Sequence, residues 1–291
     1  MLNTDEIRIR DPFVFVETET STYYLFGTTD ENVWNGKASG FDFYTSKDLT
    51  NWNGPFPAFR PEQTFWADRH FWAPEVHYYR GSYYMLASFK AAQACRGTQI
   101  LKADQPAGPY YPISDQPVTP RDWECLDGTL YVDQDQQPWL VFCWEWLQVG
   151  DGKMCALRLS EDLRTSIGKP ICLFSASEAD WPRPVNKKTD QFVTDGPFLY
   201  YENGQLSMLW SSIAEHGYAI GVSRSVSGEI QGPWQHERQV LIEKDGGHGM
   251  LFQTLEKEWM LAIHAPNQSP NERPTFINVG RQLPLQGTIK V

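Results

Sequence analysis

The sequence predicts an all-β fold, namely a single five-bladed β-propeller with about four antiparallel strands in each blade. Three observations predict it: a composition rich in aromatic residues, many short apolar runs bounded by turn residues, and a set of polar residues that recurs five times. Aromatic residues make up 14% of the 291 residues, which suits strands, while 22 Gly and 20 Pro suit the turns between them.

Short apolar runs typical of strands are spread over the whole chain. The clearest of them are residues 13–16, 23–26, 83–86, 139–142 and 259–262. The segments between these runs lack the long 3.6-residue periodicity of amphipathic helices. This pattern favours an all-β fold over an α/β fold.

Five polar residues precede such runs by 8 to 12 positions, a spacing typical of β-hairpins. These anchor residues are Asp11, Glu75, Asp127, Asp195 and His248, and they stand 64, 52, 68 and 53 residues apart. Repeats of about 50 residues are typical of propeller blades, whereas two β-sandwiches would show no shared period. The predicted blades cover 8–60, 72–118, 124–175, 192–243 and 246–288 of a single domain, 1–291.

The charge balance argues against two classes of partner. The sequence contains 25 Lys and Arg against 36 Asp and Glu, so the net charge is −11. A protein this acidic has little general affinity for nucleic-acid backbone or for an anionic membrane surface. No run of 18 apolar residues predicts a transmembrane helix. We therefore expect neither a nucleic-acid nor a membrane partner, and the sequence predicts no oligomeric state.

The cysteines and the first residues lead to an expectation about the compartment. Five cysteines, an odd number, stand at positions 95, 125, 143, 155 and 172 without a CxxC pair. Free thiols are typical of a reducing compartment, and this spacing disfavours a zinc site. Residues 1–6 show neither the basic nor the apolar region of a signal peptide. From these features we expect a cytoplasmic protein.

The five anchor residues are candidates for a functional site. In a propeller the first strand of each blade lines the central axis, so polar residues at the heads of these strands converge. Several carboxylates around one funnel repel one another unless they are used. The alternative is ordinary turn chemistry, because Asp-Gly and Asp-Pro pairs are common in turns. Five such residues at equivalent positions favour the functional interpretation.

Five motifs of this chain resemble the blade heads of glycoside hydrolase family 43, and they occur in the family's order. They are Arg10-Asp11-Pro12, Trp72-Ala73-Pro74-Glu75-Val76-His77, Leu126-Asp127-Gly128-Thr129, Thr194-Asp195-Gly196-Pro197-Phe198 and Gly247-His248-Gly249. The resemblance implies a five-bladed catalytic propeller. It also implies a substrate containing α-L-arabinofuranosyl, β-D-xylosyl or galactosyl units, hydrolysed with inversion at the anomeric carbon. Because the sequence shows neither a binding module nor an export signal, we expect a small oligosaccharide instead of a polymer.

The resemblance also implies the roles of three carboxylates. Asp11 would be the general base that activates water, and Asp127 would raise the pKa of the acid and orient it. The family's acid is a Glu in a Thr-Glu-Gly-Pro motif, whereas this chain has Asp195 there. The aspartate is shorter by one methylene, a reach of about 1.5 Å.

This departure leaves three hypotheses open. Asp195 is the acid despite its shorter side chain, or the acid is Glu145, which stands between Trp144 and Trp146. Flanking rings would desolvate Glu145 and raise its pKa, although a solvated strand end is its alternative. In the third hypothesis the protein has lost catalysis and only binds sugar.

Substrate contacts are predicted from aromatic and charged residues near the motifs. Sugar sites combine ring platforms with polar contacts. The candidates are Phe71, Trp72, Glu75, Trp144 and Arg281. Their alternatives are the apolar core for the rings, a turn for Glu75 and a surface ion pair for Arg281.

His248 is the candidate metal residue. By the resemblance it would face a hydrated Ca²⁺ ion on the propeller axis. The alternative is a buried, hydrogen-bonded histidine, because Ca²⁺ prefers oxygen ligands. No cofactor is expected to be required for the chemistry itself.

Three other functions remain open. Trp123-Glu124-Cys125 resembles the acid/base motif of the retaining glycoside hydrolase families 32 and 68, but no Asn-Asp-Pro-Asn-like motif opens the first blade. A mannoside phosphorylase needs a basic cluster for phosphate, which the sequence does not show. A non-catalytic carbohydrate-binding propeller needs rim aromatics but not three carboxylates on the axis.

Overall fold

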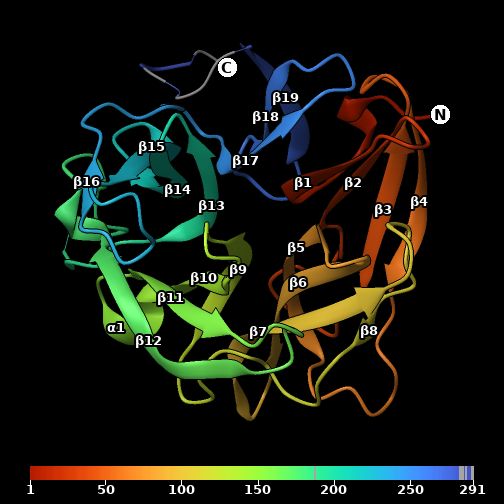
Figure 1. Cartoon of the computed structure of the whole chain (residues 1–291), viewed down its shortest axis with the longest axis horizontal. Coiled ribbons are helices and arrows are strands. Elements are labelled where there is room, and N and C mark those ends of the chain that lie inside the picture. The colour runs from red at the N-terminus through yellow and green to blue at the C-terminus, as the bar shows by residue number, and fades with distance from the viewer. Residues whose placement is uncertain (187, 282–284, 286, 290–291) are drawn as a thin grey trace.

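The computed structural model describes residues 1–186, 188–281, 285 and 287–289, and these form a five-bladed β-propeller. Five antiparallel sheets stand around a common axis (Figure 1). The predicted all-β propeller is therefore confirmed. Across the residues given, no helix combines the length and apolar character that crossing a bilayer requires.

The first three sheets have four strands each. They contain β1 (Arg10–Glu17), β2 (Thr22–Thr28), β3 (Phe41–Ser46) and β4 (Trp52–Phe59); β5 (Arg69–Tyr79), β6 (Ser82–Ala91), β7 (Ala94–Ala103) and β8 (Tyr111–Pro112); and β9 (Cys125–Val132), β10 (Pro138–Trp144), β11 (Lys153–Leu159) and β12 (Ser166–Ser175).

The last two sheets complete the circle. They contain β13 (Asp195–Glu202), β14 (Gln205–Ala214), β15 (Gly217–Ser225) and β16 (Trp234–His236); and β17 (Gly247–Gln253), β18 (Trp259–Ala265) and β19 (Arg273–Gly280). In the described part of the chain, three short helices lie outside the sheets, at η1 (Thr4–Glu6), α1 (Trp146–Val149) and η2 (Ala176–Glu178). Within the described ranges the fifth sheet has three strands instead of the four expected.

The second sheet starts earlier than predicted. Its first strand begins at Arg69, three residues before the predicted blade start at residue 72. Trp72 already lies inside this strand, where it pairs with Ser88. That residues 1–291 act as one catalytic domain stays a prediction.

Each blade's first strand lies nearest the axis and is bulged close to its start (Figure 1). A bulge leaves one residue unpaired and re-aims its side chain. The residue inside each bulge has a positive φ between 46° and 54°. These five bulge residues are Asp11, Ala73, Asp127, Gly196 and His248.

The bulges correct one assumption of the sequence analysis. Asp11, Asp127 and His248 do occupy equivalent positions, as predicted. Asp195 instead stands one residue before its bulge, and Glu75 stands two residues after the bulge of its strand. The distance from an anchor residue to the next apolar run varies from 8 to 12 residues. A shift of one or two positions relative to the bulge therefore could not be recognised from this spacing alone.

Hydrogen bonds between blades hold the bulges in place. In four of the five blades the bulge N–H donates to a side chain on the second strand of the preceding blade. The four bonds are Ala73 to Thr28 Oγ1 (2.8 Å), Asp127 to Ser88 Oγ (2.9 Å), His248 to Ser211 Oγ (2.9 Å) and Asp11 to His264 Nδ1 (3.1 Å). This network fixes the residues that face the axis.

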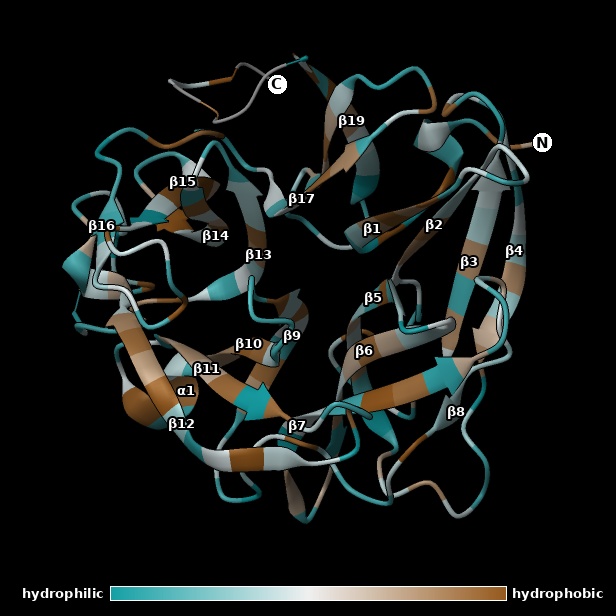
Figure 2. Cartoon of the chain, in the orientation of Figure 1, coloured by the Kyte–Doolittle hydropathy of each residue, from teal (hydrophilic) through white to brown (hydrophobic). Residues whose placement is uncertain are grey.

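Aromatic residues fill the spaces between blades, as their abundance predicts. In Figure 2 the strand ribbons carry most of the hydrophobic colour, while the connecting loops are largely hydrophilic. Between the first two blades, Phe41, Phe59, Phe71 and Phe89 pack with ring centroids 4.8 to 6.3 Å apart. Phe71 is buried there, so its predicted place in a sugar site is wrong.

Candidate active site

A cavity of about 660 Å³ opens where the heads of the inner strands meet. It collects most of the predicted site residues from blades that are distant in sequence. Those that line it are Asp11, Trp72, Asp127, Glu145, Asp195 and His248. The convergence of these side chains makes this cavity the candidate active site.

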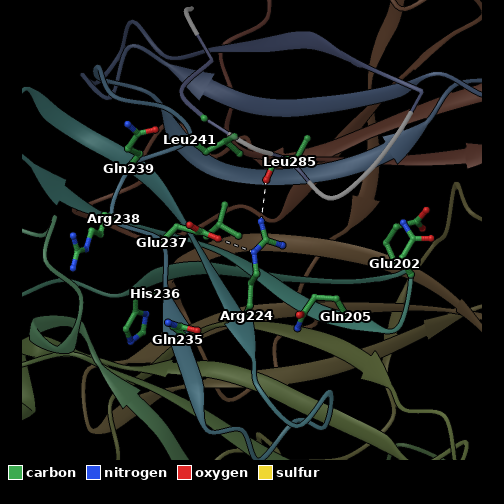
Figure 3. Close-up of a pocket in the computed structure, with 13 residues that line it drawn as sticks. Glu202, Gln205, Arg224, Gln235, His236, Glu237, Arg238, Gln239, Leu241 and Leu285 are labelled. Carbon is green, nitrogen blue, oxygen red and sulfur yellow. Dashed lines mark hydrogen bonds and ion pairs between the residues drawn. The ribbon is translucent and has the colours of Figure 1, made fainter.

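A larger cavity of about 840 Å³ lies on the fourth blade (Figure 3). Its Arg224 donates hydrogen bonds to Glu237 and to the carbonyl oxygen of Leu285, so the cation is already paired. None of the five anchor residues lines this cavity. We therefore place the chemistry in the axial cavity, despite its smaller volume.

Asp11 is held as a carboxylate. Thr28 Oγ1 donates to its Oδ2 at 2.7 Å, and His248 Nδ1 lies 3.2 Å from its Oδ1. Burial alone would raise the pKa of Asp11, but His248, Arg10 and the other donors outweigh burial and hold that pKa below its usual value. An ionised carboxylate of this kind can accept a proton from water.

Asp127 has the opposite electrostatic environment, although it occupies the equivalent bulge. Burial and the nearby charge of Asp11 raise the pKa of Asp127 well above its ordinary value. The backbone N–H of Gly196 donates to its Oδ2 at 3.0 Å, and His248 Nδ1 lies 3.6 Å from the same oxygen. His248 therefore stands between the two carboxylates.

Asp195 is a second carboxyl group whose surroundings favour the protonated form. The phenol of Tyr218 donates to its Oδ2 at 3.0 Å. Burial and the neighbouring Asp127 raise the pKa of Asp195 to about 8. The side chain is consequently protonated at neutral pH, as a general acid requires.

Glu145, the other candidate acid, is bound to a cation. Arg96 Nη1 donates to its carboxylate, and both side chains are buried. Burial raises the pKa of Glu145, while Arg96 acts against this shift by favouring the charged form. Arg96 also lies over the Trp72 ring, 4.1 Å from its centroid, and donates to His70 Nδ1 at 3.0 Å. Glu145 thus belongs to the cavity wall.

Three further predicted site residues lie outside the cavity. Trp144 stacks on Trp123 with ring centroids 3.6 Å apart, and Arg281 is an exposed side chain 3.6 Å from Glu258. Glu75 is buried, and its Oε2 lies 3.0 Å from His77 Nε2. Glu75 contributes only its charge to the site, because it helps to raise the pKa of Asp127.

The residues around His248 do not form a cage for Ca²⁺. The histidine offers nitrogen to a cation that prefers six to eight oxygen ligands, and its Nδ1 already faces two carboxylates. Across residues 1–186, 188–281, 285 and 287–289, no group of three or more His, Cys, Asp or Glu side chains is arranged to hold a metal ion. We derive no chemical step through a metal, and the Ca²⁺ site stays a prediction.

The structure adds residues to the site that the sequence analysis missed. Arg10 stands next to Asp11 in its motif, and its guanidinium lines the cavity. Arg96 and Tyr218 come from β7 and β15, the third strands of their blades. Arg10 is the one of these three residues that stands inside a blade-head motif, so it alone could have been found from those motifs.

Two curated relatives match parts of the chain. The extracellular exo-α-(1→5)-L-arabinofuranosidase ArbA of Cellvibrio japonicus is 29% identical over 174 residues, which are 54% of this chain and 45% of that protein. The extracellular endo-α-(1→5)-L-arabinanase 1 of Bacillus subtilis is 23% identical over 83% of this chain and 72% of its own length. The chain thus spans less than half of the first relative.

These names contradict the cytoplasmic prediction, because both relatives are described as extracellular. The prediction relied on free cysteines, which proved a poor indicator. Cys125, Cys143 and Cys155 are buried in the apolar core. A buried thiol acts as a small apolar side chain in either compartment.

Solved structures share the fold over nearly the whole chain. The endo-arabinase from Bacteroides thetaiotaomicron is 40% identical, covers 99% of both chains and has a TM-score of 0.90. A thermostable family-43 glycoside hydrolase has the same fold at 22% identity, with a TM-score of 0.78 over 96% of this chain. A family model described as glycosyl hydrolases family 43 matches residues 6–287. The chain therefore belongs to glycoside hydrolase family 43.

Proposed function

We propose that the protein is an inverting hydrolase of α-L-arabinofuranosyl linkages in arabinose-containing oligosaccharides. Family membership implies an oligosaccharide substrate. The arabinan-directed names of the 40%-identical structure and of both curated relatives support arabinose as its sugar. The observation that carries the reaction type is the opposite pKa shift of two carboxyl groups in one cavity, Asp11 and Asp195.

The mechanism assigns these two groups complementary tasks. Ionised Asp11 takes a proton from a water molecule, and the oxygen of that water attacks the anomeric carbon. Protonated Asp195 gives its proton to the leaving glycosidic oxygen on the opposite face of the sugar. A single displacement of this kind inverts the anomeric configuration.

The remaining residues position these groups. Asp127 raises the pKa of Asp195, so the acid keeps its proton near neutral pH. His248 and Thr28 favour the charged form of Asp11. Arg96 and Glu145 neutralise each other beside Trp72, whose ring offers an apolar face to a sugar.

Asp195 is the acid in this proposal, and Glu145 is not. The neutral phenol of Tyr218 is the hydrogen-bond donor to Asp195, whereas Glu145 accepts from a guanidinium. Burial raises the pKa of Glu145, but its bound guanidinium opposes this rise, whereas the neighbouring Asp127 adds to the rise at Asp195.

Turnover tests this function directly. Linear α-1,5-arabino-oligosaccharides and the nitrophenyl derivatives of arabinofuranose, xylose and galactose are incubated with the purified protein, and the released sugars are separated by chromatography. We expect release from the arabinosyl substrates, and a loss of at least about 100-fold in Asp11→Ala. Binding of the same oligosaccharides without turnover would instead identify a carbohydrate-binding module.

We also propose that the protein acts outside the cytoplasm, on the strength of the two extracellular relatives. Fractionation of the native cells, followed by immunoblotting, tests this location. Recovery of the protein with cytoplasmic markers alone contradicts it.

A further inference from the structure

The junction between the third and fourth blades differs from the other four. At the others, the bulge N–H donates to a side chain on the second strand of the preceding blade. The residue at that position in the third blade is Cys143, which pairs with Leu126 on β9 just as Thr28 pairs with Arg10 on β1. A thiol is a weak hydrogen-bond acceptor.

The bulge N–H at this junction has a different acceptor. Gly196 donates to Oδ2 of Asp127 at 3.0 Å. Cys143 is fully buried, and its Sγ contacts the sulfur of Met154 at 4.0 Å. Asp127 therefore occupies the place that a hydroxyl oxygen takes at three of the equivalent junctions and His264 Nδ1 takes at the fourth.

The first blade shows what a hydroxyl does at this position. Thr28 Oγ1 accepts from the N–H of Ala73 at 2.8 Å and donates to Oδ2 of Asp11 at 2.7 Å. The hydroxyl thus separates the carboxylate of Asp11 from the backbone of the next blade. In the third blade nothing intervenes, and Asp127 bonds directly to the residue that follows Asp195.

We propose that Cys143 is a positioning residue, because its lack of a hydroxyl lets Asp127 bond directly to Gly196 and stay beside Asp195. The inference rests on the proposed roles of Asp127 and Asp195. Burial also raises the pKa of the Cys143 thiol well above its usual value, so the residue stays neutral and adds no charge next to the two carboxyl groups.

Two substitutions separate this role from simple packing. Cys143→Ser introduces a hydroxyl of nearly the same size, and Cys143→Ala removes the sulfur without offering a hydroxyl. In Cys143→Ser the hydroxyl accepts from Gly196 and displaces the Asp127 carboxylate from this backbone N–H. In Cys143→Ala the direct bond between Gly196 and Asp127 remains.

Kinetics on arabino-oligosaccharides provide the first readout. For Cys143→Ser we expect kcat to fall by about 10- to 100-fold with little change in KM, because displacements near 1 Å cost about 100-fold. Its basic pH limit should move to lower pH, since Asp127 then raises the pKa of Asp195 less. Cys143→Ala should keep the wild-type pH profile. Equal kcat losses and equal pH profiles in the two variants would overturn the proposal.

A second readout needs no substrate, so it remains decisive even if the proposed hydrolase activity is not found. In ¹⁵N-glycine-labelled protein, the Gly196 amide signal should shift strongly with pH as Asp127 titrates. The shift should persist in Cys143→Ala and shrink in Cys143→Ser. The proposal is wrong if Gly196 titrates identically in the two folded variants.

Discussion

Asp11 and Asp195 are the same type of residue, but their pKa values shift in opposite directions because their surroundings differ. Asp11 is surrounded by His248, Arg10 and Thr28, which favour its charged form. Burial and the nearby Asp127 instead favour the protonated form of Asp195 and raise its pKa. The chemistry therefore depends on the neighbours of each carboxyl group more than on the residue type.

The pKa of Asp195 predicts the basic limit of activity. A general acid works only while protonated, so turnover should fall as the pH rises through about 8. Asp195→Asn should lose about 100- to 10,000-fold in kcat on oligosaccharides and far less on aryl arabinofuranosides with good leaving groups. Glu145→Gln is the comparison, and it should lose activity to a similar degree on both substrates. The reverse pattern would make Glu145 the acid.

The same pKa predicts how stability depends on pH. Folding raises the pKa of Asp195 from 3.8 to about 8, so the folded protein binds this proton more tightly than the unfolded chain does. The stabilisation is complete below about pH 4 and is lost as the pH rises to 8. Asp195→Asn cannot ionise, so its Tm relative to wild type should increase from pH 5 to pH 8. Parallel Tm curves over this range would contradict the assignment.

Side-chain alternation explains which site residues the sequence could predict. Along a strand, successive side chains point to opposite sides. Trp72 faces the cavity, so the preceding Phe71 faces the core. Glu145 lines the cavity because β10 ends at Trp144 and the chain turns into α1, while Trp144 itself stacks on Trp123. A motif locates the right segment, but only the register determines which neighbour reaches the site.

At the scale of the elements, a bulge near the start of the first strand recurs in all five blades. The bulge residue is followed by Pro in three of the inner strands and by Gly in the other two, and such local signals are visible in the sequence. Arg96 and Tyr218 instead meet their partners Glu145 and Asp195 only through tertiary contacts, 49 and 23 residues apart in the chain. This is why the fold and the carboxylates were predictable, while the groups that tune them were not.

Gly196 tests the bulge of the fourth blade. Its φ is +51°, and a Cβ atom there would lie 2.8 Å from the His248 ring. Gly196→Ala should therefore lower both Tm and kcat, because the ring must move away from Asp11 and Asp127. Gly204→Ala is the matched control, since Gly204 also has positive φ (+81°) but no atom within 4 Å of an added Cβ. Equal effects on kcat in the two variants would show that only backbone strain matters.

At the scale of the whole molecule, the propeller must join its first and last blades. Arg10 on β1 donates to Glu272, at the start of the segment leading into β19, at 2.8 Å. The backbone of the same region receives a bond from Ile9. Figure 1 shows these two blades side by side. These contacts join the first and last blades next to Asp11, the proposed general base.

The closing ion pair should be worth far more than a surface pair. The Glu272 side chain is fully buried and that of Arg10 is 12% exposed. Glu272→Ala leaves a buried cation without its partner, and we expect a loss of about 3 kcal/mol in unfolding free energy. In the exposed pair of Arg183 with Glu215, the substitution Glu215→Ala should cost less than about 1 kcal/mol. Urea unfolding of both variants measures the difference, and similar losses would refute the closing role.

The configuration of the first-formed sugar tests the central claim most directly. Proton NMR of the wild-type reaction on an α-L-arabinofuranoside, recorded before mutarotation, distinguishes the two anomers. A base at Asp11 and an acid at Asp195 predict that the β-anomer of arabinose appears first. Initial release of the α-anomer would mean that a carboxylate attacks the sugar instead of water, and it would contradict the account.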